Sequence, residues 1–139
     1  LALRMDRICE NALKVANYLK NHPKVGWLNY AGLTDHTDHA LVQKYMGGRA
    51  SGLISFGLKA SDSLEAGARF QDALQLFTRL VNIGDAKSLA CHPATTTHRQ
   101  LNAAEMAKAG VKPDMVRLSI GIEHIDDLIA DLDQALEAV

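Results

Sequence analysis

The sequence predicts an α/β domain: a two-layer sandwich in which about four strands form a mostly antiparallel or mixed sheet, with the helices mainly on one face. Two observations support this prediction. Along the chain, stretches with helical spacing of apolar residues alternate with stretches typical of strands. The 139 residues, 47% hydrophobic and 22% charged, also suit a single domain over residues 1–139 with its own core.

The first half of the chain predicts a helix, a strand, a short helix and a second strand. Apolar residues recur every three or four positions between Ile8 and Leu19, which indicates a helix over residues 2–20. The run VGWLNY at 25–30 is rich in residues that favour strands. A short helix over 38–46 then leads to the alternating strand GLISFGLK at 52–59.

The third predicted helix begins at Asp62, which has Glu65 three residues later as in a capping box. Its apolar stripe extends this helix to about 82–84, where a glycine can end it. The stripe consists of Phe70, Leu74, Phe77 and Val81.

The remaining elements are two strands and two helices. Short apolar runs predict strands over 87–92 and 115–120, separated by a threonine-rich loop and a short helix over 101–109. Helical spacing of apolar residues predicts a last helix over about 125–138. The order of the strands in the sheet does not follow from these patterns.

Composition and charge exclude several classes of function. A net charge of −1 and the lack of a basic tract speak against a nucleic-acid partner. The apolar runs are far shorter than the ~20 residues of a membrane-spanning helix. Cys9 and Cys91 are widely separated and match no zinc or redox spacing, so free thiols in a cytoplasmic protein are expected.

Arg117 is the first candidate functional residue. Strand alternation places Val116 and Leu118 on one face of the last strand and Arg117 on the other, away from the helices. An arginine amid an apolar strand must be solvated or paired with an anion. Its planar fork suits a carboxylate, although the pattern alone favours an exposed arginine or one paired with a nearby acidic residue.

Ser88 is the second candidate. At the start of a strand its hydroxyl, with nearby backbone N–H groups, can bind an anion, or it can bond to its own turn.

Other groups of polar residues point to no specific chemistry. His36 and His39 lie three residues apart, and His92 and His98 flank the threonine-rich loop, but complete zinc sites have fuller ligand sets. The glycine-rich run at 47–52 matches no phosphate-binding motif, and a flexible connection is the simpler interpretation.

Two long motifs carry a resemblance to a known family. The run GDAKSLACHPATTTH at 84–98, together with VRLSIGIE at 116–123 and DDLIADL at 126–132, resembles signature stretches of the trans-sulfuration, or Cys/Met metabolism, family of PLP-dependent enzymes. The similarity extends over nearly the whole chain. Within the family the wording most resembles O-acetylhomoserine sulfhydrylases, with cystathionine synthases, cystathionine lyases and methionine γ-lyases as close relatives.

The resemblance implies the small C-terminal domain of PLP fold type I, with pyridoxal phosphate as the cofactor of the parent enzyme. The Schiff-base lysine would lie in a large domain that precedes this segment, and none of the eight lysines here stands in the family's lysine motif. The chain alone is therefore expected to be inactive and to bind no cofactor covalently. By resemblance, Arg117 would bind the α-carboxylate of an amino-acid substrate, with help from Ser88.

The resemblance also implies a homotetrameric parent that converts O-acetylhomoserine and sulfide to homocysteine and acetate. A different function stays open from the residues themselves. The chain can equally be a non-catalytic α/β module that binds small carboxylates or a protein partner.

Overall fold

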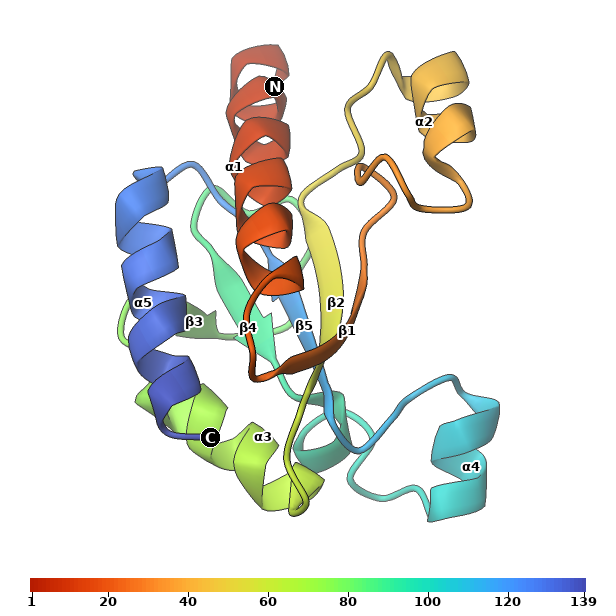
Figure 1. The fold of residues 1–139 in the computed structure, drawn as a ribbon, viewed down its shortest axis with the longest axis vertical. Coiled ribbons are helices and arrows are strands. Elements are labelled where there is room, and N and C mark those ends of the chain that lie inside the picture. The colour runs from red at the N-terminus through yellow and green to blue at the C-terminus, as the bar shows by residue number, and fades with distance from the viewer.

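A five-stranded mixed sheet forms the centre of the computed structural model, which describes residues 1–139 (Figure 1). The strand order is β1-β2-β5-β4-β3, and every neighbouring pair is antiparallel except β3 and β4. The strands are β1 (Val25–Asn29), β2 (Leu53–Leu58), β3 (Thr78–Arg79), β4 (Leu89–Cys91) and β5 (Met115–Ser119). The predicted α/β class with a mixed sheet is confirmed, with one short edge strand more than expected.

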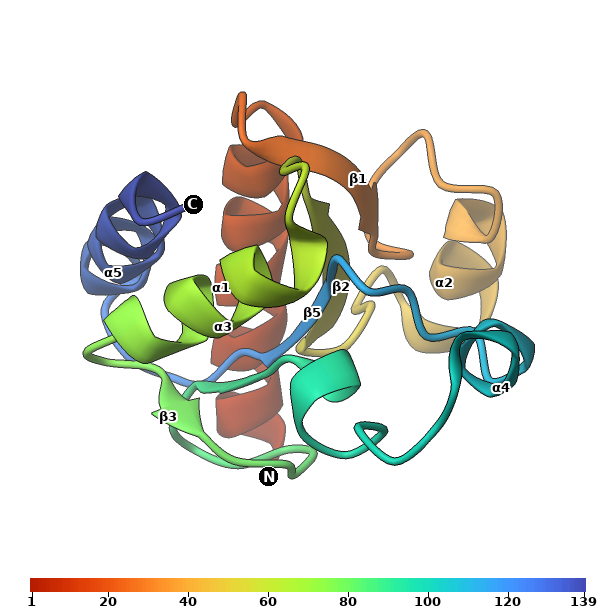
Figure 2. The same cartoon turned by 90° about the horizontal axis from the view of Figure 1, so that it is seen from below.

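Three helices cover one face of this sheet. Helix α1 packs against α5, β1 and β2, and α3 packs against α5 and β2. Helices α2 and α4 stand apart from this layer (Figures 1 and 2). The helices are α1 (Ala2–Lys20), α2 (His39–Met46), α3 (Ser63–Ala73), α4 (Ala103–Lys108) and α5 (Ile125–Glu137), with a 3-10 turn at Pro93–Thr95. None of these helices is both long and apolar enough to cross a bilayer.

The core lies between the helical layer and the facing side of the sheet. Alternate residues of the two central strands point into it, and none of them is more than 3% exposed: Ile54, Phe56 and Leu58 of β2, and Val116 and Leu118 of β5. Phe56 meets Phe70 of α3 edge to face, with ring centroids 5.8 Å apart. Burial of this apolar row fixes which residues of β5 face away from the helices.

Most predicted elements have the expected type and begin or end within a few residues of the expected positions. Helix α4 has a start signal that the sequence analysis missed. Asn102 accepts a hydrogen bond from the N–H of Glu105, and the Glu105 side chain accepts one from the N–H of Asn102, which completes a capping box. Asp38 and Asp62 both stand at N-cap positions, but neither side chain makes a capping hydrogen bond.

The predicted length of α3 was wrong. The helix ends at Ala73, about ten residues early, and the chain turns into β3. The cause is Asp131 of α5, whose carboxylate accepts hydrogen bonds from the N–H groups of Gln75, Leu76 and Phe77 at 2.8, 2.9 and 3.0 Å. These N–H groups would otherwise continue the helical ladder. Phe77 is still buried, whereas Val81, the last member of the predicted stripe, is 50% exposed.

The capping box predicted at Asp62 was also wrong, because the Asp62 carboxylate instead accepts from Arg69 at 2.8 Å. The Arg69 guanidinium holds the pKa of Asp62 below its ordinary value. This ion pair joins two exposed side chains, so it contributes little to stability.

The role of Asp131 can be tested by removing its charge. We expect Asp131→Asn to lower the free energy of unfolding by about 3 kcal/mol, because three N–H groups lose a charged acceptor. Urea unfolding measures this change. The matched control is Asp127→Asn, an exposed position in the first turn of the same helix, which should lower stability by less than about 1 kcal/mol because only a favourable charge near the helix N-terminus is lost. Equal effects of the two variants would show that Asp131 does not hold this turn.

Candidate functional site

Arg117 lies in the middle of β5 on the face opposite the helices. It pairs in register with Ser55 of β2 on one side and Cys91 of β4 on the other, and Ser55 pairs with Asn29 of β1. Residues that pair directly across antiparallel strands share a face of the sheet. The four residues therefore form one cross-strand row, and this row, which we call the Arg117 row, crosses the uncovered face.

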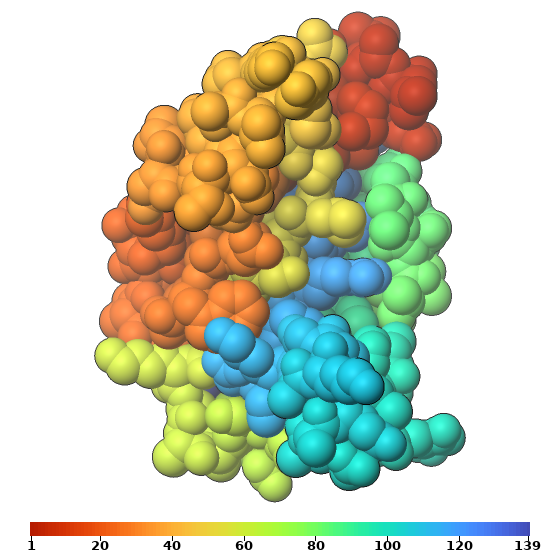
Figure 3. All heavy atoms as spheres, turned by 90° about the vertical axis from the view of Figure 1, so that its right-hand side faces the viewer, coloured from red at the N-terminus to blue at the C-terminus, as the bar shows by residue number.

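The face that carries the Arg117 row is hollowed. Figure 3 shows a depression between the segment that contains α2 and the segment around residues 80–88, and β2 and β5 form its floor. Arg117, which β5 carries on this face, is half-buried.

The guanidinium of Arg117 has no partner within the chain. It takes part in no hydrogen bond or ion pair, although seven of the acidic side chains do pair with cations or histidines elsewhere. Its neighbours in the row, Asn29, Ser55 and Cys91, are neutral. A half-buried cation with five free donors in a fixed plane is a suitable ligand for a carboxylate. The structure thus does not support pairing with a local acidic residue.

Ser88 lies just before β4, and its hydroxyl and N–H form hydrogen bonds with other residues of the chain. The Ser88 hydroxyl donates to Oε2 of Glu123 at 2.9 Å, and the Ser88 N–H donates to Oε1 at 2.6 Å. The N–H of Gly121 donates to the Ser88 hydroxyl at 2.8 Å. Ser88 is fully buried. The predicted anion site at Ser88 therefore holds a carboxylate, but one supplied by Glu123, and contact between Ser88 and a substrate stays a prediction.

The histidines named as candidate metal ligands are engaged with neutral groups. His36 bonds to Asn29 at 2.8 Å, His39 bonds to Gln43 at 3.2 Å, and no three His, Cys, Asp or Glu side chains gather into a possible metal site. The glycine-rich run ends α2, with Gly47 and Gly48 at φ of +57° and +82°. It is a connection between elements, as the pattern favours.

His92 is buried beneath α3. Its Nε2 donates to the carbonyl of Pro113 and its Nδ1 shares a hydrogen bond with the Thr95 hydroxyl, both at 2.8 Å. A Cβ atom at Gly67 would lie 2.2 Å from this ring, so the histidine fits only because position 67 is glycine. Burial lowers the pKa of His92. The residue is a structural contact and not a free ligand.

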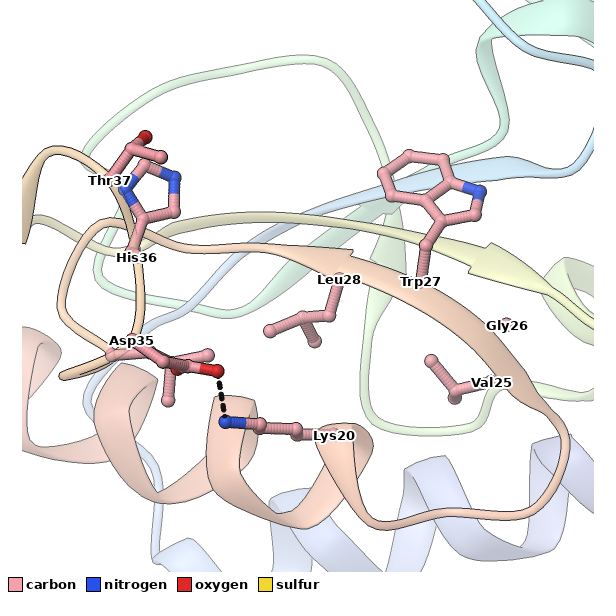
Figure 4. Close-up of a pocket in the computed structure, with 9 residues that line it drawn as sticks. Lys20, Val25, Gly26, Trp27, Leu28, Asp35, His36 and Thr37 are labelled. Atoms are coloured by element: carbon pink, nitrogen blue, oxygen red, sulfur yellow. Dashed lines mark hydrogen bonds and ion pairs between the residues drawn. The ribbon is translucent and has the colours of Figure 1, made fainter.

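The largest pocket is a different part of the surface from the Arg117 row. It has a volume of about 470 Å³ and lies between β1, the end of α1 and the loop after β1 (Figure 4). Lys20 donates to Asp35 across it at 2.6 Å, which satisfies both charges. Trp27 points to the other side of β1 from Val25 and Leu28 in the same view. Neither Arg117 nor Ser88 lines this pocket.

Comparisons with known proteins match nearly the whole chain to one enzyme family. The family model described as Cys/Met metabolism PLP-dependent enzyme matches residues 1–137. The chain is 48% identical over 136 residues to O-acetyl-L-homoserine sulfhydrylase 1 of Thermus thermophilus, covering 98% of this chain and 32% of that protein. It is 46% identical over 139 residues to L-methionine gamma-lyase of Pseudomonas deceptionensis, covering 100% of this chain and 34% of that protein.

A solved structure supports the same relationship. A crystal structure from Campylobacter jejuni, described as an O-acetylhomoserine (thiol)-lyase with pyridoxyl-lysine monophosphate, matches with a TM-score of 0.88 and 47% identity. The match covers 98% of this chain and 32% of that one. The chain thus spans about a third of the length of the relatives it matches.

The buried His92 predicts a dependence of stability on pH. Because its pKa in the folded chain lies below the ordinary value of 6.5, only the unfolded chain takes up this proton as the pH first falls below about 6.5. The free energy of unfolding should therefore fall below that pH, by at most about 1.4 kcal/mol per pH unit from this residue. Urea unfolding between pH 7.5 and 5 measures the slope. His92→Gln, which does not titrate, should show a smaller slope, and an unchanged slope would contradict the assignment.

Proposed function

Since the chain belongs to the Cys/Met metabolism family of PLP-dependent enzymes, we propose that residues 1–139 are the C-terminal, substrate-binding domain of such an enzyme. The domain that binds the cofactor lies outside these residues in this proposal. The share of the relatives that the chain matches, about a third of their length, supports this division.

The proposed reaction converts O-acetylhomoserine and sulfide to homocysteine and acetate. The name of the Thermus relative, a sulfhydrylase, and that of the Campylobacter structure, an O-acetylhomoserine (thiol)-lyase, support it. The gamma-lyase among the relatives supports a second candidate, elimination from methionine. Both reactions act on an amino acid whose α-carboxylate must be held, so Arg117 has the same task in each.

Arg117 binds the α-carboxylate of the substrate in this proposal, and the unpaired guanidinium on the hollowed face is the observation that supports it. Two parallel hydrogen bonds from its planar fork fix the carboxylate in position and in rotation. The substrate's α-carbon is thereby oriented towards the reacting group, which contributes to the rate through proximity. Pyridoxal phosphate, when bound, withdraws electrons from that carbon.

Ser88 belongs to the same site in a supporting position. Its hydroxyl and N–H bond to Glu123, which lies four residues beyond the end of β5, the strand that carries Arg117. We further propose that the parent enzyme is a homotetramer of the cytoplasm whose partner is a small amino-acid substrate. The family resemblance is the support for these last statements.

The assignment of Arg117 predicts a large loss of activity on substitution. In the enzyme that contains this chain, Arg117→Ala should lower kcat/KM for O-acetylhomoserine by a factor on the order of 10² to 10³, because two charge-assisted hydrogen bonds are lost. The kcat/KM of Arg117→Lys should lie between those of the unchanged enzyme and Arg117→Ala, since lysine keeps the charge but lacks the planar pair of donors. Steady-state kinetics with sulfide measures the effect. Arg99→Ala, at an exposed arginine, is the matched control. A normal kcat/KM for Arg117→Ala would contradict the proposal.

The placement of the cofactor outside the chain is tested separately. Residues 1–139 are mixed with pyridoxal phosphate, reduced with borohydride and weighed by intact-mass spectrometry. We expect no stoichiometric adduct on any single lysine, because the proposal places the cofactor lysine elsewhere. One adduct per chain at one lysine would mean that the chain holds a cofactor site of its own. That result would favour a complete binding module over a domain of a larger enzyme.

A further inference from the structure

The carboxylate of Glu123 takes both hydrogen-bond donors that Ser88 offers. Its two oxygens receive the N–H and the hydroxyl of Ser88 at 2.6 and 2.9 Å. A carboxylate bound through both oxygens has a fixed orientation as well as a fixed position. Glu123 is thus a built-in anion in the place where the sequence suggested an external one.

The space around Ser88 is closed. The Ser88 hydroxyl also accepts the N–H of Gly121 at 2.8 Å, and Ser88 is 0% exposed. A side chain at Gly121 would come within 2.5 Å of Oε2 of Glu123 and within 2.4 Å of the Ala86 carbonyl. A substrate carboxylate could reach Ser88 only by displacing a like-charged group from hydrogen-bonding distance, which is unfavourable.

Helix α1 reinforces the same junction. The side chain of Asn11, itself 0% exposed, donates to the carbonyls of Gly121 and Glu123 at 3.1 and 2.9 Å. The N–H of Ile122 donates to the Ala86 carbonyl at 2.9 Å. The chain segments before β4 and after β5 are therefore joined to each other and to the helical layer by bonds from several directions.

This junction lies at the end of the ladder that places Arg117. In that ladder Leu89 pairs with Ser119, and Cys91 pairs with Arg117. Ser88 precedes the first of these rungs and Gly121 follows it, so their hydrogen bond opposes any sliding of β4 along β5. A shift of β4 by one residue would turn Cys91, the neighbour of Arg117 in the row, to the other face of the sheet. Glu123 holds Ser88 in the orientation that this bond requires.

We propose that Glu123 is a positioning residue of the Arg117 site, an inference that rests on the proposed function. Its carboxylate holds Ser88 and Gly121 together, and the strand ends so fixed keep Arg117 in its place in the row on the uncovered face. Ser88 then acts through this junction without touching the substrate. Arg117 is the group of this chain that takes the substrate carboxylate.

The direction in which Glu123→Gln changes KM distinguishes this role from direct binding of the substrate by Ser88. If Glu123 positions Arg117, Glu123→Gln and Ser88→Ala should each raise KM for O-acetylhomoserine about tenfold in the enzyme that contains this chain, because a small displacement of a binding group weakens its contact. The double variant should be little worse than either single one, since all three lose the same junction. If Ser88 binds the substrate directly, Glu123→Gln removes a competing negative charge and should lower KM.

The comparison is run with steady-state kinetics on the two single variants, the double variant and Glu65→Gln, an exposed glutamate of α3 that controls for loss of charge. Raised KM for both single variants without additivity supports the proposal. A lowered KM for Glu123→Gln, or additive effects, overturns it. Ser88→Ala removes only one oxygen atom and provides the measurement if Glu123→Gln does not fold.

A second readout separates failure of this inference from failure of the proposed function. A double-mutant cycle for Ser88 and Glu123 in urea unfolding of the chain measures their coupling without any substrate. If Ser88 and Glu123 are coupled in stability but Arg117→Ala leaves kcat/KM unchanged, the proposed function is wrong and the junction is still supported. No coupling in stability would overturn the junction whatever the kinetics show.

Discussion

The pairing of β2 with β5 at the centre of the sheet is the constraint on which the rest of the structure depends. Because side chains alternate along a strand, the same register that buries Phe56 and Leu118 against the helices turns Ser55 and Arg117 to the other face. The apolar row therefore influences the site although it lies on the other face of the sheet. It fixes the direction of the arginine by making the alternative register bury a charge.

Patterns local in sequence predicted most of the fold, and interactions between distant segments explain where they failed. Helical and strand periodicity located α1, β2, β5 and α5, whose faces are decided by their own residues. The end of α3 is decided instead by Asp131, more than fifty residues away in sequence. Its carboxylate offers the N–H groups after Ala73 a better acceptor than the helix does, and no local signal marks that choice.

Local sequence patterns likewise predicted one part of the candidate site and missed another. Alternation along one strand was enough to place Arg117 on the uncovered face. The state of Ser88 could not be read from its neighbours, because its partners, Glu123 and Gly121, lie more than thirty residues away. The pattern VRLSIGIE did contain the needed glutamate, but an acidic residue after a strand is too common to point to a serine on another strand.

The one-sided cover of the sheet bears directly on how strongly Arg117 can bind. A carboxylate that pairs with a half-exposed arginine exchanges one hydrated state for another, so the net gain in water is small. The same pair becomes much stronger when a neighbouring surface excludes water from it, provided that both hydrogen bonds are formed. The chain supplies an arginine whose face of the sheet is already fixed, but the layer of α1, α3 and α5 covers the other face. Under the proposed function, tight binding at Arg117 would therefore need a cover from outside these residues.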